Sequence, residues 1–490
     1  YGLGLLFSVT NKFYLRLDAA KPASDIPPSN NEDPQYYFGF NYTFDSERPS
    51  QLRGGIGLFQ GAAANVWLSN PFTNTGFGYI DYNLSSGFPD DAPCMQPGQR
   101  CFVADPNNQI SLIPPGARTG TQSIDFVDPD LGQPSIWKAN LAFDTELPWW
   151  GVVGAAELVV TSVKEAIYYQ HLNLGDPTRV GQDGRLMYWN DPGYDPSRWN
   201  EFGSNINPED APRVFNRSGA NSSFSDAIIA RPTNKGESQQ FTVSLEKPFN
   251  DTDWFWRLAY TYTNATEVSP LTSSTSGSQW GNNVALNPND EVASTSSYEI
   301  RDRFSAAVSW RHAFFGNYNT SVSMFYEGRT GRPYSYVFDN DANGDSRFGN
   351  DLIYIPQGPG DVLFGSPEEE AAFWDFVAGD EYLNQNRGRV AERNGARGGW
   401  VNQLDIRVSQ ELPGFMEGHK SEIWVDVLNV GNLINEDWGQ IEEMTFPFGR
   451  GVVEYGGIDA ATGKYVYRFN DPDSLSIYDG SYQAMHAWEG

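Results

Sequence analysis

The stretch from Phe338 to Pro356, FDNDANGDSRFGNDLIYIP, concentrates oxygen-bearing side chains between two segments with strand-like composition. Position 12 of the EF-hand calcium spacing falls on Asn350, where a bidentate glutamate is usual, and RPYSYVF before the stretch is typical of a strand rather than a helix. A true EF-hand is therefore not expected. Four residues do follow the first, third, fifth and seventh positions of that spacing: Asp339, Asp341, Asn343 and Asp345.

Two interpretations of this stretch stay open. In the first, Asp339, Asp341, Asn343 and Asp345 hold a calcium ion within a connection between strands. In the second, the stretch is a solvated turn whose side-chain oxygens accept hydrogen bonds from their own backbone.

The two cysteines, Cys94 and Cys101, lie in CMQPGQRC, where Pro97 and Gly98 favour a turn. With no histidine nearby they make a poor zinc site but a feasible small disulfide loop, which indicates an oxidising compartment. Two free thiols are the alternative.

Sequence signatures of enzymes are missing: the chain has no HExxH, no GxSxG and no P-loop. The four histidines, at 171, 312, 419 and 486, are scattered along the chain. We therefore expect no catalytic residues, and no cofactor other than the calcium ion considered above.

Charge and composition narrow the class of protein. The chain has 33 Lys and Arg against 62 Asp and Glu, a formal net charge of -29, which argues against nucleic acid as a partner because phosphate binding needs clustered cations. The acidity favours a solvated surface, or loops that collect divalent cations. Aromatic residues make up 14% of a chain whose mean hydropathy is only -0.50, as expected for a wall with one apolar and one wet face.

Alternation of period two recurs along the whole chain. In DWFWRLAYTYTN the aromatic and apolar residues Trp254, Trp256, Leu258, Tyr260 and Tyr262 fall on one face, and the residues between them are mostly small or polar. This pattern predicts a strand with two different environments. Segments of this kind are expected at 1–10, 12–20, 36–45, 50–60, 134–147, 152–173, 236–248, 253–266, 297–315, 317–338, 400–412 and 421–434.

Short turns and long loops alternate between these segments, as in an up-and-down barrel of an outer membrane. No apolar run approaches the roughly 18 to 20 residues of a membrane helix, so strands in a closed barrel remain the way to span a bilayer. Twelve strands closing alone and a larger barrel completed by further chain are both compatible with the pattern.

Two features stand out in the long loop between 338 and 400. SPEEEAAFWDFVAGD predicts a helix in which Ser366 is the N-cap, Glu369 completes a capping box and Gly379 ends the helix. The second feature is a mixed-charge cluster, interpreted either as salt bridges that anchor the loop or as a ligand-contacting patch: Arg387, Arg389, Glu392, Arg393 and Arg397.

Three segments, together with the predicted loop helix, resemble the Oar-like branch of TonB-dependent outer-membrane receptors: QLRGGIGLFQGAAANVWLSNPFTNTG, RGRVAERNGARGGWVNQLDIRVSQELP and SEIWVDVLNVGNLINEDWG. The stretch DNDANGDSRFGNDLIYIP also resembles a loop of that branch. The resemblance implies a barrel of about 22 strands around an N-terminal plug, driven by a TonB-type partner in the inner membrane. The chain contains neither a plug nor a TonB-contacting motif, and no individual ligand-contacting residue can be transferred from the family.

We therefore expect an all-β, transmembrane antiparallel up-and-down barrel with long extracellular loops and one short loop helix. Residues 1–490 would form its barrel domain, with the plug and first strands absent from this chain. Its function would be energy-coupled uptake or export of a scarce or bulky solute across a bacterial outer membrane, in contact with lipid, lipopolysaccharide and a TonB-type complex. The alternatives are a passive porin or structural barrel, and a secreted calcium-dependent glycan-binding β-protein.

Overall fold

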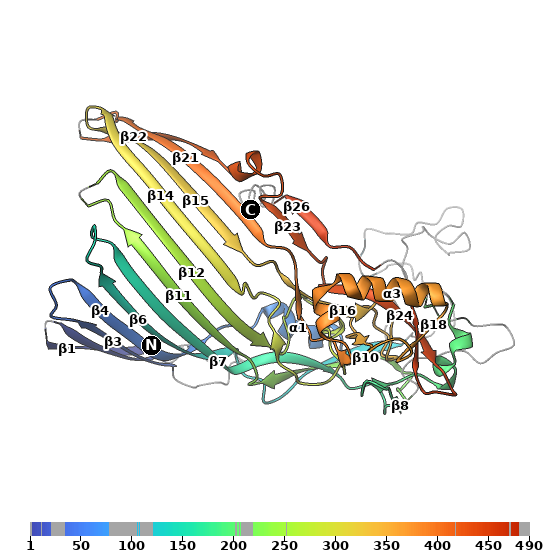
Figure 1. Ribbon diagram of the computed structural model, residues 1–490. Coiled ribbons are helices and arrows are strands. Elements are labelled where there is room, and N and C mark those ends of the chain that lie inside the picture. The colour runs from blue at the N-terminus through green and yellow to red at the C-terminus, as the bar shows by residue number, and fades with distance from the viewer. Residues whose placement is uncertain are drawn as a thin grey trace.

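The computed structural model describes residues 2–10, 12–20, 35–77, 105, 107, 121–200, 203–204, 206, 219–250, 252–416, 418–469 and 472–479. One long curved wall of strands dominates the fold, and the loops at one end of it gather into a second compact body (Figure 1). In the part of the chain described, no helix has both the length and the apolar character needed to cross a membrane.

The wall consists of strands that pair in chain order, each antiparallel to the next (Figure 1). The strands are β1 (Gly2–Thr10), β2 (Phe13–Ala20), β3 (Gln35–Thr43), β4 (Ser50–Gln60), β6 (Ser135–Glu146), β7 (Val153–His171), β11 (Glu237–Lys247), β12 (Trp254–Glu267), β14 (Asp302–Phe315), β15 (Tyr318–Arg329), β21 (Val401–Pro413) and β22 (Lys420–Val427). This confirms the predicted all-β, antiparallel up-and-down fold, and each predicted strand corresponds to one strand of the wall.

Three predicted strands extend well beyond the wall strands that they contain, and the first of them, 297–315, begins five residues before β14. The segment 317–338 divides at residues 330–332, after which β16 (Pro333–Phe338) leaves the wall and pairs with β24 (Gly449–Ile458). The segment 421–434 ends as a strand at Val427 and continues as a 3-10 helix, η4 (Val430–Leu433).

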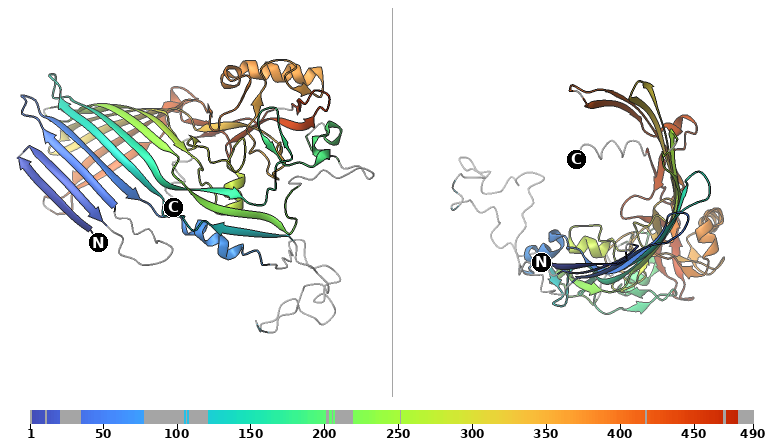
Figure 2. Two further views of the ribbon diagram at one scale, coloured as in Figure 1. Left: turned by 90° about the horizontal axis from the view of Figure 1, so that it is seen from below. Right: turned by 90° about the vertical axis from the view of Figure 1, so that its left-hand side faces the viewer.

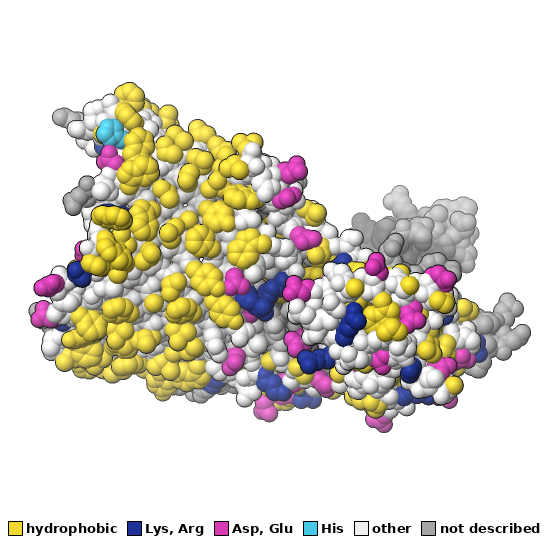
Figure 3. Space-filling model, in the orientation of Figure 1, with side chains coloured by type: hydrophobic (Ala, Val, Ile, Leu, Met, Phe, Trp, Pro, Cys, Tyr) yellow, Lys and Arg dark blue, Asp and Glu magenta, His cyan; other side chains and the backbone are white. Residues whose placement is uncertain are grey.

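The wall has a convex apolar side and a concave polar side. Seen along the strands it forms an open arc, with β1 and β22 at its two ends (Figure 2). The convex side carries a broad field of apolar side chains (Figure 3). On β12 the residues Trp254, Leu258, Tyr260 and Tyr262 are each more than a third exposed, as expected for side chains that face lipid rather than a protein core.

The long loops carry elements that were predicted only as loop. Residues 61–133 contain α1 (Asn65–Thr73) and β5 (Gln122–Val127), and β5 pairs in parallel with β10 (Phe224–Thr233), which also extends the pairing of β7. Near them are α2 (Ser276–Gly281) and the short strand β13 (Ser294–Thr295), which pairs with β12.

We call residues 179–199, 333–397 and 444–468 the loop domain. Its sheet runs in the order β18 (Leu363–Phe364), β25 (Tyr465–Arg468), β24, β16 and β20 (Ala396–Arg397). Its other elements are β8 (Arg179–Val180), β9 (Leu186–Met187), η2 (Asp191–Tyr194), η3 (Pro196–Arg198), β17 (Tyr354–Ile355), α3 (Pro367–Gly379), α4 (Glu381–Gln385) and β19 (Arg389–Val390). Beyond it, β23 (Gln440–Glu443) pairs with β26 (Ser476–Asp479).

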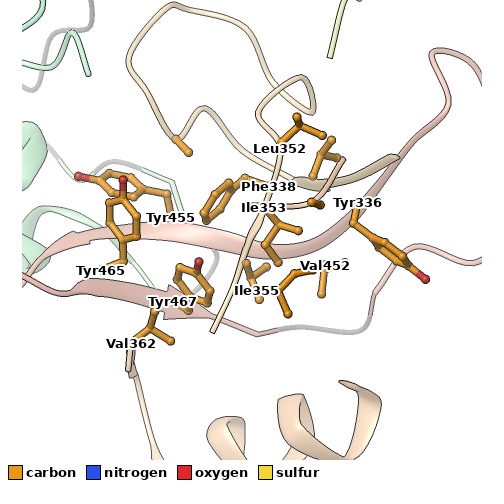
Figure 4. Packing of buried hydrophobic residues seen from close by; sticks show 14 of the residues in the cluster. Tyr336, Phe338, Leu352, Ile353, Ile355, Val362, Val452, Tyr455, Tyr465 and Tyr467 are labelled. Atoms are coloured by element: carbon orange, nitrogen blue, oxygen red, sulfur yellow. The ribbon is translucent and has the colours of Figure 1, made fainter. Parts of the chain in front are cut away.

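The loop domain has its own aromatic core, shown in Figure 4. Phe338 lies edge-on to Tyr467, with ring centroids 5.4 Å apart, and Tyr465 stacks near Tyr467 at 6.4 Å. Trp189 and Trp199 from the preceding loop pack against Tyr455 in the same core. Aromatic pairs of this kind add to the hydrophobic burial, so segments far apart in sequence are held as one folded unit.

Helix α3 forms where the sequence predicts it. The hydroxyl of Ser366 accepts a hydrogen bond from the backbone N–H of Glu369 at 3.2 Å, and Pro367 occupies the first turn. The Glu369 carboxylate accepts from the backbone N–H of Gly365 at 3.3 Å, one residue before the cap. Phe373 and Val377 are the residues of this helix that are buried, and they join the aromatic core of the loop domain.

Candidate functional site

The concave side of the wall is a polar surface with matched partners across neighbouring strands. Period-two alternation places these side chains opposite the apolar ones, so the same strands that present Leu258 and Tyr260 to the outside present Arg and Asp to the inside. The pairs include Arg53 with Asp144, Arg303 with Glu327, Arg407 with Asp426, Asn140 with Glu157, Thr242 with Thr261, and Ser309 with Ser323. Such a lining suits a water-filled passage.

The Asp-rich loop between β16 and β17 folds inward and is buried in the loop domain. We call five of its residues the carboxylate cluster; they are exposed by only 1 to 4% of their surface: Asp341, Asn343, Asp345, Asn350 and Asp351. Asp339 lies apart from this cluster, at an exposed position beside Gly451. The structure therefore brings together three of the four residues predicted from the EF-hand spacing.

Hydrogen bonds from backbone N–H groups to aspartate side chains hold the loop in a series of tight turns. Asp341 accepts from the N–H of Gly344 at 2.6 Å and from that of Ser346 at 2.8 Å. Asp345 accepts from Arg347 N–H at 2.8 Å. The side-chain oxygens thus accept hydrogen bonds from their own backbone, as the solvated-turn interpretation predicted. The cluster, however, is buried rather than solvated.

One buried arginine serves the carboxylates of this region. Arg185 is 0% exposed and donates to Asp351 at 2.8 Å and to Asp183 at 3.2 Å. Asp183 also accepts from the Tyr465 hydroxyl at 2.7 Å. Asp341 and Asp345 have no arginine or lysine among the partners described.

Burial shifts the protonation of these groups. Loss of solvation, reinforced by the neighbouring carboxylates, raises the pKa of Asp341 well above its ordinary value and that of Asp345 to about 7. Desolvation also raises the pKa of Asp351, although Arg185 opposes the shift. Burial thus disfavours the charged form of Asp341, Asp345 and Asp351.

One acceptor in the cluster is unused. The Oδ1 atom of Asn350 is buried and has no hydrogen-bond partner in the described part of the chain, while its Nδ2 atom lies 3.4 Å from Asp345. Among the described residues no three His, Cys, Asp or Glu side chains converge in an arrangement ready for a metal ion. A cation here would therefore need amide oxygens and small side-chain rotations in addition to carboxylates.

The predicted mixed-charge cluster anchors the loop domain to the end of the wall. Arg393 is buried and donates to the carbonyl oxygen of Val268 at 2.6 Å and to Asn283 Oδ1 at 2.8 Å. Arg397 forms an ion pair with Glu299. Since these groups are engaged with the protein itself, the structure favours the anchoring interpretation over a ligand patch at these two residues.

The remaining predicted residues stay outside any common site. Cys94 and Cys101 lie outside the described residues, so their disulfide stays a prediction. His171 is buried beside Asp226 at 3.1 Å, and His312 lies 2.8 Å from Asp253 in a short turn of the wall.

Comparison with known proteins bears directly on the wall. A sequence profile described as "Outer membrane beta barrel domain" matches residues 27–439, most of the chain. The chain belongs to this family of outer-membrane β-barrel domains. Its location is therefore the bacterial outer membrane, where the convex apolar side of the wall faces lipid.

Other likenesses of this outer-membrane barrel domain are distant. No curated protein matches the chain. Among solved structures, the outer membrane transporter YddB from Escherichia coli is 11% identical, with a TM-score of 0.45 over 95% of this chain and 42% of that one. The siderophore receptor PiuA from Acinetobacter baumannii is 10% identical, with a TM-score of 0.26 over 95% of this chain and 56% of that one. The chain spans less than two thirds of either protein, and neither likeness is close enough to inform its function.

Sequence reasoning missed part of the carboxylate cluster of this barrel domain. Asp351 lies just outside the EF-hand spacing, and its neighbour Asn350 occupies position 12, where that spacing calls for glutamate. Asp183 and Arg185 lie about 160 residues earlier, in GQDGRLMYW, which reads as an ordinary turn. The residues around Asp183 and Arg185 contain no pattern that indicates the contact of Arg185 with Asp351.

Proposed function

We propose that this outer-membrane barrel domain is the channel part of a TonB-dependent transporter of the Oar-like branch. It would carry a scarce or bulky solute by energy-coupled uptake or export. The observation that carries the proposal is the combination of a polar concave wall with a folded, rather than loose, body of loops at one end of it. Such a body provides a surface that can select a solute before it enters the passage.

The two open edges of the wall support a wide barrel, which suits transport of a large solute. In hydrocarbon every backbone N–H and C=O must be paired, so the outer edges of β1 and β22 need further partners. Within the described residues these two strands are the ends of the wall and do not pair with each other. We infer that more strands than these close the barrel, and a barrel of about 22 strands has a lumen wide enough to need a plug.

A passive porin shares the wall and is the competing proposal. Its pore would stand open, whereas the lumen of a plugged transporter stays closed until an energised partner acts. Membership of an outer-membrane family argues against the secreted glycan-binding alternative.

Planar bilayer recordings on the full-length protein distinguish the two. We expect no steady open conductance from the native protein, and binding of the purified periplasmic domain of the TonB-type partner. A well-characterised porin in the same bilayers is the control for insertion. Steady conductance together with no binding of the partner would establish the passive porin and refute the proposal.

A further inference from the structure

The carboxylate cluster and the neighbouring Asp183 bury more carboxyl groups than the described cations compensate. Asp183, Asp341, Asp345 and Asp351 are almost completely removed from solvent, against the single buried guanidinium of Arg185. Isolated buried carboxylates are costly, and they become tolerable when protonated, paired or bound to a metal ion. Arg185 pairs with Asp183 and Asp351, which leaves Asp341 and Asp345 without a cationic partner among the described residues.

The oxygen atoms around Asp345 are poorly satisfied by their present neighbours. Among the described residues its Oδ2 atom has two amide donors, Asn343 Nδ2 at 3.3 Å and Asn350 Nδ2 at 3.4 Å, both longer than an ordinary hydrogen bond. Beside it, the Oδ1 atom of Asn350 is buried without a hydrogen-bond partner from the residues that the structure describes. Because the two ends of an amide have nearly the same shape, a half-turn of the Asn350 side chain would direct this oxygen toward Asp345.

We propose that the carboxylate cluster binds one calcium ion through oxygens of Asp341, Asp345 and Asn350, with Asp351 at its edge. An all-oxygen site with flexible geometry suits calcium better than magnesium, which demands a near-ideal octahedron. The ligands differ from those expected from the EF-hand spacing, since Asp339 is excluded and Asn350 is included.

Hydrogen bonds to neighbouring segments hold the backbone on both sides of the cluster in place. Binding of the ion would therefore involve rotation of side chains rather than movement of the backbone. The carbonyl oxygen of Asn343 accepts from Tyr188 N–H at 2.6 Å, and that of Asn350 accepts from Ala285 N–H at 3.0 Å. The indole of Trp189 donates to the carbonyl oxygen of Ala342 at 3.2 Å. An ion in the cluster would therefore tie the 339–351 loop to the 183–189 segment and stiffen the loop domain.

Calcium titration of the full-length protein in detergent tests the proposal. We expect one calcium ion to bind, measured by calorimetry, with a dissociation constant on the order of 0.1 to 1 mM, the range of extracellular calcium modules. Terbium, which replaces calcium in such sites, should show luminescence sensitised by nearby Trp189, and calcium should displace it while magnesium does not.

Two isosteric variants separate this ligand set from the alternatives. Asp345→Asn should abolish calcium binding and terbium luminescence, whereas Asp339→Asn, in the same loop but outside the cluster, should leave both unchanged. Absence of binding in the native protein would overturn the proposal, as would equal binding in Asp345→Asn. Loss of binding in Asp339→Asn would instead support the ligands of the EF-hand spacing and overturn those proposed here.

Thermal unfolding of the loop domain distinguishes loss of calcium binding in Asp345→Asn from a general folding defect. With a chelator present, Asp345→Asn should be at least as stable as the native protein, because it removes a buried negative charge. With saturating calcium the order should reverse, since only the native protein gains stability from the ion. A variant that is equally destabilised with and without calcium would show a structural role for Asp345 and contradict the proposal.

Discussion

Replacement of Arg185 by methionine should open the loop domain locally. Methionine fills a similar volume but removes both ion pairs, which leaves the carboxylates of Asp183 and Asp351 buried and unpaired. It also removes the donor to the carbonyl oxygen of Leu352. Breaking a buried pair by removing one partner costs about 3 to 5 kcal/mol, because the other charge is left without compensation.

This loss can be read as a change in hydrogen exchange. At about 1.36 kcal/mol per factor of ten, the amides of β16 and β24 should exchange roughly two to four orders of magnitude faster in Arg185→Met. Mass spectrometry on the full-length protein in detergent, with a chelator present, measures this directly. The amides of the wall strands β12 and β14 provide an internal reference that should not change.

An arginine in the same domain provides the matched control. Arg389 is exposed in β19, so Arg389→Met should change the exchange of β16 and β24 by no more than a few-fold. If Arg185→Met also stayed within a few-fold of the native protein, the buried ion pairs would not hold the loop domain together and the reasoning would be refuted.

Three further predictions concern protonation, helix capping and the lipid face. With a chelator present, the loop domain should become more stable as the pH falls from about 8 to about 5, because burial raises the pKa of Asp345 to about 7 and the folded state then binds protons more tightly than the unfolded one; a flat melting temperature over this range would contradict it. Ser366→Ala should cost about 1 kcal/mol and speed exchange about five-fold in the first turn of α3, with the wall unchanged. Leu258→Arg on the convex side should destabilise the barrel by about 2 to 4 kcal/mol, whereas Ala259→Arg on the concave side should be tolerated, as measured by heat-modifiable gel mobility; equal effects would contradict the assigned faces.

Much of the wall was predictable because its physics is local. In each strand, apolar residues that face lipid alternate with small or polar residues that face the lumen. The sequence DWFWRLAYTYTN therefore predicts both β12 and the side of it that faces lipid. Capping is equally local, which is why Ser366 and Gly379 mark α3 correctly. The division of 317–338 was missed because PYSYVF continues the same alternation, although β16 turns away to serve the core of the loop domain.

The candidate site was less predictable because its partners are distant in sequence. The EF-hand spacing identifies Asp341, Asn343 and Asp345, but it cannot show that Asp339 lies apart from them. Nor can it show that Arg185, from another loop, donates a hydrogen bond to Asp351. These contacts depend on how separate loops pack around Tyr455 and Tyr467. Long-range packing of this kind leaves no regular spacing for sequence reasoning to detect.

In this structure the wall spans the outer membrane with its convex side in lipid and its concave side in water. Spin labels placed one at a time from residue 254 to residue 263 of the full-length protein in lipid vesicles, with Cys94 and Cys101 replaced by serine, test it most directly. We predict that collisions with oxygen dissolved in the lipid and with a water-soluble nickel reagent alternate with period two, lipid contact being high at Trp254, Leu258 and Tyr260. Equal accessibility at successive positions would contradict the claim.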